Sequence, residues 1–458
     1  MKTDTIAAIA TAMSPSGIGI IRISGEDAFS IIDKIYQSVS GSKRLSECES
    51  HTIHYGYICD GEDIIDEVMV LLMRAPRSYT KEDSIEIDCH GGVYVMKRIL
   101  ETVIKYGARP AEPGEFTKRA FLNGRIDLTQ AESVIDVIQS KNEFALKSSL
   151  RQLKGSVKRD ISDIRSVIIH EIAYIESALD DPEHISLEGY PHQLLSIVQE
   201  QKNKIERLLN SSDNGRILKE GIKTVILGKP NAGKSSLLNV LTGTDRAIVT
   251  DIAGTTRDVL EEQINLNGIT LNIMDTAGIR DTSDLVEQIG VDKAKKYAMD
   301  ADFIIYVMDS STDIDENDLS IMELLKDRKA IVLLNKSDLD VVITEEDVRK
   351  HLDKKIICVS AKEQLGIQEL EDTIREMFFH GEVSFNDEVY ITNIRHKNAL
   401  MDSMESLKLV MQSIEDGMPE DFYSIDLMNA YESLGTIIGE SVEDDLVNEI
   451  FSKFCMGK

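Results

Sequence analysis

Cysteine is scarce in this sequence, and its spacing excludes two kinds of framework. The 458 residues include five cysteines, and no two of them form a Cys-x-x-Cys pair. They are Cys48, Cys59, Cys89, Cys358 and Cys455. Zinc sites use closely spaced ligand pairs, and secreted disulfide scaffolds use an even number of cysteines. The sequence therefore predicts reduced thiols in a cytoplasmic protein, without a disulfide framework or a zinc site.

Long apolar runs are missing as well. No run approaches the roughly 18 residues that a helix needs to cross a bilayer, and the first residues lack the apolar region of a signal peptide. Lys and Arg are absent from residues 415–450, which carry many Asp and Glu. Such a segment would be repelled by an anionic lipid surface. The sequence therefore predicts no association with a membrane.

Positive charge is in deficit. Lys and Arg number 51 against 80 Asp and Glu, a formal net charge of −29, which argues against broad binding to nucleic acid because phosphate contacts need cations. A local basic patch is not excluded. Lys147, Arg151, Lys154 and Lys158 recur at helical spacing and are predicted to share one helix face. That face could meet RNA phosphates, although a merely solvated face is the favoured interpretation.

The residues that are present form regions of different texture. Residues 1–118 mix β-rich runs with helical stretches, which predicts an α+β domain. Residues 119–215 and 380–458 have apolar residues at helical spacing, whereas residues 216–379 alternate apolar β-runs with helices in the manner of a parallel sheet. The simplest arrangement is a discontinuous α-helical bundle into which an α/β domain is inserted, since domain termini are often close together.

The strongest motif is GKPNAGKSS, which starts at Gly228. It matches the P-loop pattern GxxxxGK[ST], follows an apolar strand and precedes an apolar helix, which is the context that this motif requires. Its glycines let backbone N–H groups close around phosphates. Lys234 reaches the β- and γ-phosphates, and the Ser235 hydroxyl binds Mg²⁺.

Three further motifs end apolar strands in the order expected of a GTPase. DTAG begins at Asp275, where the carboxylate can face the metal ion. NKSD ends at Asp338, whose carboxylate can accept two N–H bonds from guanine that adenine cannot supply. SAK begins at Ser360 and can support the same base. Ligands bind at the carboxyl ends of strands in such sheets, so the four motifs together predict a GTPase.

The residue that positions the attacking water is not obvious. Ras-like GTPases have a Gln shortly after the DxxG motif, but Ile279 and Arg280 stand here. Glu287 is the nearest candidate. Local sequence alone favours the interpretation that Glu287 is a solvated charge on a helix.

The combination of GKPNAGKSS, TDIAGTTRD, DTAGIRD and a terminal FCMGK resembles the MnmE (TrmE) family of tRNA-modifying GTPases over essentially the whole chain. The resemblance implies a homodimer that joins an FAD-containing MnmG partner in a heterotetramer. Together they would add an aminomethyl or carboxymethylaminomethyl group to C5 of the wobble uridine of certain tRNAs. A 5-formyl- or methylene-tetrahydrofolate bound by residues 1–118, which also dimerise, would supply the carbon. A GTP-dependent switch without modifying chemistry is the alternative, and it leaves the N-terminal domain and the FCMGK tail unexplained.

The resemblance also implies ligands for GTP and two metal ions. GTP would be bound by Asn231, Ala232, Gly233, Lys234, Ser235, Ser236, Thr250, Asp251, Ile252, Ala253, Gly254, Thr255, Thr256, Asp275, Thr276, Ala277, Gly278, Asn335, Lys336, Asp338, Ser360 and Ala361. Mg²⁺ would be held by Ser235 and Thr256. K⁺, which would promote G-domain pairing and hydrolysis, would be held by Asn231, Thr250, Ile252 and Thr255. Glu287 matches the water-orienting acid of the family, and Lys234 would assist catalysis.

For folate, the matching residues are Arg22, Glu86, Arg125 and Lys458. The family often has Lys where Arg125 stands, which keeps the charge and changes its geometry. Arg22 and Glu86 could instead simply pair with other charges. Cys455 cannot be a prenylation site, because Gly457 and Lys458 do not fit that signal. It would belong to a tail that closes on the folate site, either as a nucleophile or as a packing group.

Overall fold

The computed structural model describes residues 4–39, 41, 43–243, 262–266, 269–274, 298–379, 391–440, 444–452, 454 and 457. The chain divides into two compact units. One unit combines Met1–Ile138, Leu150–Lys202 and Ala399–Lys458, and the other combines Gln139–Ser149 and Asn203–Asn398. Among the described helices, none has both the length and the apolarity that crossing a bilayer requires.

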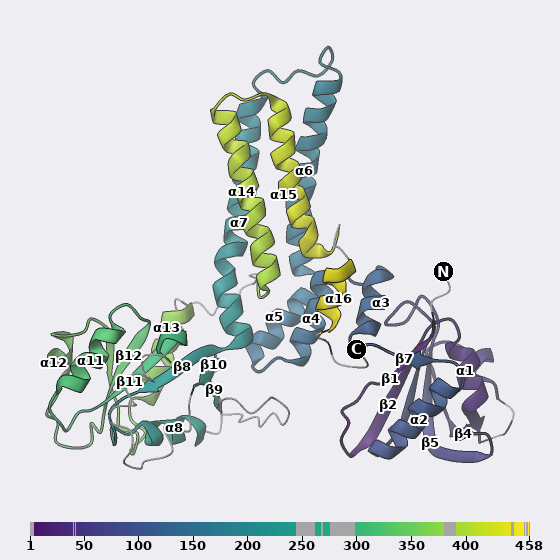
Figure 1. Ribbon diagram of the computed structural model, residues 1–458, viewed down its shortest axis with the longest axis horizontal. Coiled ribbons are helices and arrows are strands. Elements are labelled where there is room, and N and C mark those ends of the chain that lie inside the picture. Colours follow the sequence, from purple (N-terminus) through teal and green to yellow (C-terminus); the bar gives the residue numbers. More distant parts are fainter. Residues whose placement is uncertain are drawn as a thin grey trace. The chain divides into compact units, whose positions relative to one another are not determined.

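The N-terminal part of the first unit is a seven-stranded sheet with the order β3-β4-β5-β6-β2-β1-β7. Neighbouring strands are antiparallel, except that β1 and β7 are parallel. The strands are β1 (Ile6–Ile9), β2 (Ser16–Ser24), β3 (Tyr36–Ser38), β4 (Thr52–Asp60), β5 (Asp63–Met73), β6 (Ser84–Gly91) and β7 (Arg109–Pro110). With α1 (Ala28–Ile35) and α2 (Val93–Lys105), they form the α+β domain that the sequence predicts (Figure 1).

Strand periodicity explains which side chains of this sheet are available for binding. Ile21 and Ile23 of β2 are fully buried in one cluster with Ile32 of α1 and Ile99 of α2. Successive side chains of a strand point to opposite faces. Arg22, between the two isoleucines, therefore points to the face that α1 and α2 do not cover.

The helices before and after the α/β sheet have the predicted apolar spacing. They are α3 (Glu115–Leu122), α4 (Leu128–Ile138), α5 (Glu143–Leu153), α6 (Ser156–Asp180), α7 (Tyr190–Glu220), α14 (Ile394–Glu415), α15 (Glu420–Ile438) and α16 (Asp444–Ser452). Helices α6 and α15, which are far apart in the sequence, pack side by side (Figure 1). The Arg165 guanidinium of α6 lies 3.9 Å from the ring centre of Tyr431 and donates to its backbone oxygen.

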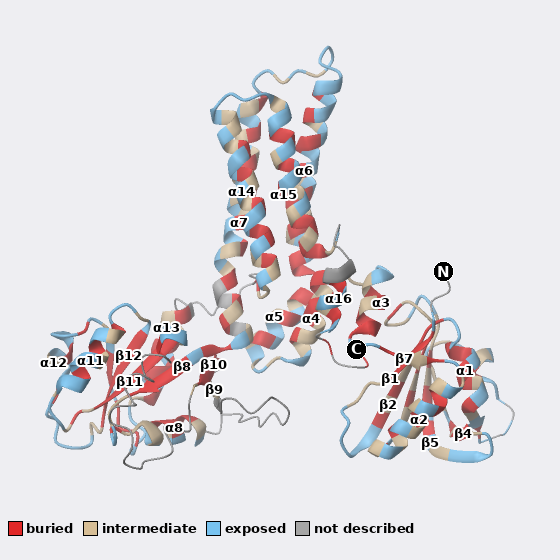
Figure 2. Ribbon diagram, viewed as in Figure 1, coloured by how far each residue is buried: buried red, intermediate tan, exposed pale blue. Residues whose placement is uncertain are grey.

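The second unit contains a six-stranded sheet with the order β13-β12-β11-β8-β10-β9. Its strands are β8 (Ile222–Leu227), β9 (Glu262–Leu266), β10 (Ile269–Ile273), β11 (Phe303–Asp309), β12 (Ala330–Asn335) and β13 (Lys355–Cys358). Its helices are α8 (Lys234–Gly243), α11 (Glu316–Leu325), α12 (Glu345–Arg349) and α13 (Ile367–Phe379). Figure 2 shows its central strands as buried, with apolar clusters on both faces. The three-part fold class predicted from the sequence is confirmed.

The prediction of a parallel sheet needs one correction. The edge strand β9 is antiparallel to β10, while the remaining neighbours are parallel. Between these strands the sequence has Asn267 and Gly268, a pair that tight hairpins favour because both positions tolerate positive φ. That pair is the sequence signal for the antiparallel edge.

Candidate functional sites

The P-loop has a backbone shape that glycine alone accommodates. Gly233, directly before α8, has φ +97°, and a Cβ atom there would lie 2.0 Å from Nδ2 of Asn335. Gly228, directly after β8, has φ +154°, and a Cβ atom there would lie 2.3 Å from the backbone oxygen of Val307. Glycine avoids both clashes. The loop thus leads into the N-terminus of α8, where backbone N–H groups and the helix dipole favour a phosphate.

Lys234 closes the loop on itself. Its ammonium donates to the backbone oxygens of Gly228 and Lys229, both at 2.7 Å. Burial lowers the pKa of Lys234 from its ordinary value. A bound phosphate would offer this ammonium charged oxygens in place of neutral carbonyls, and hydrogen bonds to charged acceptors are the stronger ones.

The two motifs predicted to recognise the base meet the P-loop through Asn335, the last residue of β12. Its Nδ2 donates to the backbone oxygen of Ala232 at 2.8 Å, and its Oδ1 accepts from the backbone N–H of Ala361 at 3.1 Å. The Ser360 hydroxyl donates to Asp338 at 2.6 Å and holds the pKa of that carboxyl below its ordinary value. Asp338 is exposed, so its charged carboxylate is accessible to a ligand. The structure therefore brings three of the four predicted motifs together.

Lys336, which lies between Asn335 and Asp338 in the NKSD motif, has φ +63° and forms an ion pair with Asp309 at the end of β11. Ser235 and Ser236 lie in the first turn of α8, and Asn231 adopts φ +61° in the loop before it. The described motif residues thus lie at the carboxyl ends of β8, β12 and β13, where an α/β sheet binds its ligands.

Several predicted site residues lie outside the described residues. They are Thr250, Asp251, Ile252, Ala253, Gly254, Thr255, Thr256, Asp275, Thr276, Ala277, Gly278, Glu287, Cys455 and Lys458. Their roles stay predictions from the sequence.

Sequence reasoning missed a second support of the P-loop. Lys229 pairs with Asp315 at 3.0 Å and with Asp318 at 2.7 Å. Asp318 is almost fully buried and also accepts from the Tyr306 hydroxyl at 2.7 Å. The two acids form the capping box of α11. The acidic residues at N-cap and N3 were the available signal, since a capping box needs an acceptor side chain at both positions.

In the N-terminal sheet, Arg22 and Glu86 are directly opposite one another on β2 and β6. Arg22 Nε donates to Glu86 Oε1 at 2.7 Å, and both side chains are mostly buried. Arg22 also donates to the backbone oxygen of Gly457 at 3.0 Å. The two folate candidates therefore pair with each other, and the second residue from the end of the chain reaches them.

Glycine is required at position 457. Its φ is +85°, and a Cβ atom there would lie 2.6 Å from the backbone oxygen of Ile9 in β1. Phe454 is buried in one apolar cluster with Phe451 of α16 and Leu128 of α4. Phe454 thus packs with α4, and Gly457 lies against β1 beside Arg22.

Arg125, the third described folate candidate, joins this group through an aromatic ring. Its guanidinium carbon lies 4.7 Å from the ring centre of Tyr79, and that of Arg22 lies 5.8 Å from the same centre. The ring of Phe116 is 5.7 Å from Arg22. Tyr79 and Phe116 were missed because they belong to no local motif.

The predicted basic helix face is wrong. Helix α5 ends at Leu153 and α6 begins at Ser156, so Lys154 lies in the turn between them. Gly155 in that turn has φ +82°, a conformation that glycine permits and a continuous helix does not. Lys147 and Arg151 therefore belong to α5, and Lys158 belongs to α6.

Comparisons with known proteins cover the whole chain. A family model described as the GTP-binding protein TrmE N-terminus matches residues 5–125, and one described as the MnmE helical domain matches residues 128–455. The chain is 65% identical over 458 residues to the tRNA modification GTPase MnmE of Lachnoclostridium phytofermentans, with all of both chains covered. It is 50% identical to the proteins of the same name from Acetivibrio thermocellus, with 100% of both chains covered, and from Clostridioides difficile, with 99% of both covered.

Among solved structures, the chain resembles the G domain of the T. maritima FeoB iron transporter. The two are 31% identical, and the match covers 34% of this chain and 97% of the other, with a TM-score of 0.26.

Proposed function

Because the chain belongs to the MnmE family of tRNA modification GTPases, we propose that it acts with an FAD-containing MnmG partner on tRNA. Within that family it is a GTP hydrolase. The pair adds an aminomethyl or carboxymethylaminomethyl group to C5 of the wobble uridine of certain tRNAs. A homodimer of this chain and the flavoprotein form a heterotetramer.

The observation that carries this proposal is the arginine cluster, by which we mean Arg22, Glu86, Arg125 and Tyr79. Folate has a carboxylate-bearing end, which guanidinium groups bind well. It also has a pterin ring whose N–H groups can donate hydrogen bonds to a carboxylate such as Glu86. A pure GTP switch has no use for such a site. The carbonyl of Gly457 on Arg22 supports assigning the terminal residue, Lys458, to the same site.

The nucleotide site supports hydrolysis of GTP. Lys234 would bind the β- and γ-phosphates, and Asp338 would select guanine. Ser235 would hold Mg²⁺ together with Thr256, and the metal would neutralise charge that develops on the phosphates. Glu287 is proposed to orient the attacking water.

K⁺ is proposed to assist the meeting of two G domains and thereby hydrolysis. A hard monovalent cation needs several oxygen ligands, and an amide oxygen with backbone carbonyls can supply them. The proposed ligands are Asn231, Thr250, Ile252 and Thr255. Turnover should be faster in K⁺ than in Na⁺ at equal ionic strength, and equal rates would contradict this part.

We propose that four segments of the chain form three domains with separate tasks. Residues 1–118 bind folate and dimerise, 119–215 and 380–458 form the helical domain, and 216–379 form the G domain. The matched ranges 5–125 and 128–455 support a split helical domain around an insertion. We place the protein in the cytoplasm, because its proposed substrate is a tRNA.

The whole function is tested by reconstitution. The chain, the flavoprotein, tRNA, GTP and a methylene-tetrahydrofolate are combined, and the tRNA nucleosides are analysed by mass spectrometry. A modified wobble uridine is expected only when all components are present. Product that forms equally well without folate would contradict the proposed carbon source, and the absence of product would favour the switch.

Deletion of residues 455–458 tests the tail separately. GTP binding should be unchanged, whereas folate binding and tRNA modification should fall, because the tail carries the Gly457 carbonyl that lies on Arg22. Cys455→Ser then separates the two roles of the thiol. Lost modification with intact folate binding indicates a chemical role, and retained modification indicates packing.

A further inference from the structure

The ring of Tyr79 lies near both arginines of the cluster. Both guanidinium groups lie within about 6 Å of its ring centre, the range of favourable cation–π contacts. The tyrosine ring belongs to neither strand of the Arg22–Glu86 pair. It comes from the segment between β5 and β6.

The two arginines differ in how they are held. Arg22 is fixed by Glu86 and by the backbone oxygen of Gly457. Arg125 is exposed and, among the described residues, forms no ion pair and no side-chain hydrogen bond. Its contact with the Tyr79 ring is therefore the interaction that orients its guanidinium, while its five donors stay available to an anion.

The segment that carries Tyr79 is itself fixed on both sides. The Tyr79 hydroxyl lies 2.9 Å from that of Thr117, a fully buried residue of α3. Glu82, three residues further, accepts from Arg119 of α3 at 3.1 Å and from the Ser24 hydroxyl of β2 at 2.7 Å.

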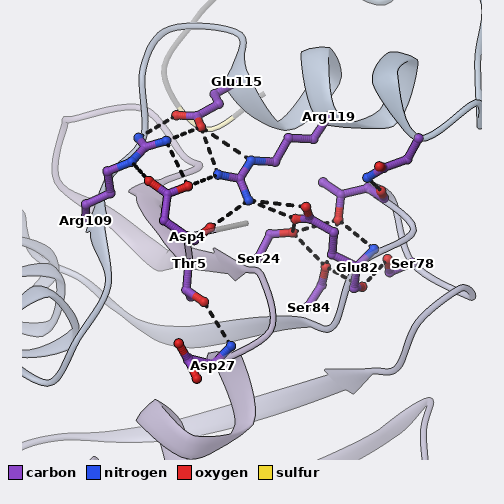
Figure 3. Close-up of polar contacts among 12 residues, drawn as sticks. Asp4, Thr5, Ser24, Asp27, Ser78, Glu82, Ser84, Arg109, Glu115 and Arg119 are labelled. Carbon is purple, nitrogen blue, oxygen red and sulfur yellow. Dashed lines mark hydrogen bonds and ion pairs between the residues drawn. The ribbon is translucent and has the colours of Figure 1, made fainter. Parts of the chain in front are cut away.

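Figure 3 shows further polar contacts that support the segment between β5 and β6. Glu82 lies between Arg119 and the serines of the sheet, and Arg119 reaches onward to Glu115 and Asp4. Arg119 and Glu115 are mostly buried, so the pairs hold their geometry better than exposed pairs do. The ring of Tyr79 is thus held by α3 and β2.

We propose that Tyr79 is a positioning residue of the arginine cluster, whose ring holds Arg125 beside Arg22 so that both cations face one anionic ligand. The inference rests on the proposed folate function for the identity of that ligand. The placement of Arg125 by the ring does not depend on it. A fixed guanidinium loses less freedom on binding than a free one, so the ring raises affinity without a contact of its own.

The first test is binding of 5-formyl-tetrahydrofolate to the full-length protein by calorimetry. Tyr79→Leu removes the ring and should weaken binding about two- to five-fold, the change that corresponds to a cation–π contact at an exposed site. Tyr79→Phe keeps the ring and loses the hydroxyl contact with Thr117, so it should bind more tightly than Tyr79→Leu. A Phe variant as weak as the Leu variant would overturn the proposal, because the hydroxyl and not the ring would then matter.

The matched control is Tyr94→Leu. Tyr94 is an exposed tyrosine of the same unit, at 73% exposure, and no described cation lies over its ring. Its loss should leave folate affinity unchanged. A Tyr79→Leu variant that binds as tightly as this control would also overturn the proposal.

The second test needs no folate. Phenylglyoxal reacts with arginine, and mass spectrometry of peptides measures the rate at Arg125. The rate at Arg125 should rise in Tyr79→Leu, rise less in Tyr79→Phe and stay unchanged in Tyr94→Leu. If the unaltered protein does not bind 5-formyl-tetrahydrofolate, the folate function fails, and the rate at Arg125 still decides the role of Tyr79. An unchanged rate in Tyr79→Leu means that the ring does not hold Arg125.

Discussion

The proposed phosphate-binding groups of the P-loop all come from residues 228–236, whereas the arginine cluster draws on residues 22–125 and is contacted by Gly457, 435 positions from Arg22. A phosphate site can be local because backbone N–H groups of one turn supply the donors. The cluster cannot be local, because its charges come from two strands and a loop, and the backbone oxygen of Gly457 joins them from the chain end. A short motif is therefore enough to reveal a site like the P-loop, whereas the contacts within the arginine cluster are visible only in the tertiary structure.

The largest expected effect is on the local site. Gly233→Ala places a methyl group against Asn335 at a φ of +97°, and it should weaken GTP binding on the order of 10³-fold through backbone strain and lost phosphate contacts. Fluorescent-nucleotide titration measures this affinity. Gly243→Ala is the matched control, since a Cβ atom there meets nothing within 4 Å. Folate binding should be unchanged in both variants. A Gly233→Ala protein with normal GTP affinity would show that GTP binding does not depend on the backbone conformation of this loop.

The next largest effect should be on the rate of GTP hydrolysis, with GTP binding unchanged. Glu287→Ala should bind GTP normally and hydrolyse it about 10²-fold more slowly in single turnover, because the water would lose its orienting base. Glu323→Ala, an exposed acid of α11, serves as the control and should hydrolyse at the normal rate. An unchanged rate of hydrolysis for Glu287→Ala would mean that Glu287 is a solvated charge without a role in hydrolysis.

Base selection should change by a smaller factor. Asp338→Asn should weaken GTP about 10- to 100-fold and favour xanthosine triphosphate, because a carboxylate that accepts two N–H bonds becomes an amide that accepts and donates. Competition between the two nucleotides measures the preference. Asp340→Asn, two residues on and exposed, should leave it unaltered. If Asp338→Asn keeps the preference for GTP, NKSD does not select the base.

The smallest effect on either site should come from Glu115, whose role is to support the fold. Burial raises the pKa of Glu115, but hydrogen bonds from Arg109, the backbone of Glu112 and Arg119 outweigh it and hold the pKa below its ordinary value. Glu115→Gln should lower the free energy of unfolding by about 1–3 kcal/mol at pH 7, with GTP affinity unchanged. Thermal unfolding measures this loss.

The pH dependence of that loss has a definite sign. A depressed folded pKa contributes stability that is present above the unfolded pKa and is lost as pH falls through the folded pKa. The difference between Glu115→Gln and the unaltered protein should therefore persist from pH 7 to about pH 5 and shrink below the ordinary carboxyl range. A difference that grows on acidification would mean that the pairs do not stabilise charged Glu115.

Much of the α/β unit was predictable because its signals are local. The runs KTVIL, FIIYVMD, AIVLLN and KIIC are strands, and motifs that follow three of them meet at Asn335. Periodicity also predicted the buried face of α6, where Ile161, Ile164, Ile168 and Ile172 are buried and Val167 is half-buried. It failed at residues 147–158, because a single glycine with positive φ ended one helix and began the next.

By itself, the sequence determined the order of the elements, the P-loop and the motif residues proposed to recognise guanine, because each depends on neighbours within a few positions. Family resemblance selected Arg22, Glu86 and Arg125 without showing how they meet. Only the tertiary structure decided that Arg22 pairs with Glu86, that Gly457 reaches them, and that the ring of Tyr79 holds Arg125. Such contacts depend on the register of β2 with β6 and on the close approach of Gly457 to β1, and no local pattern records either one.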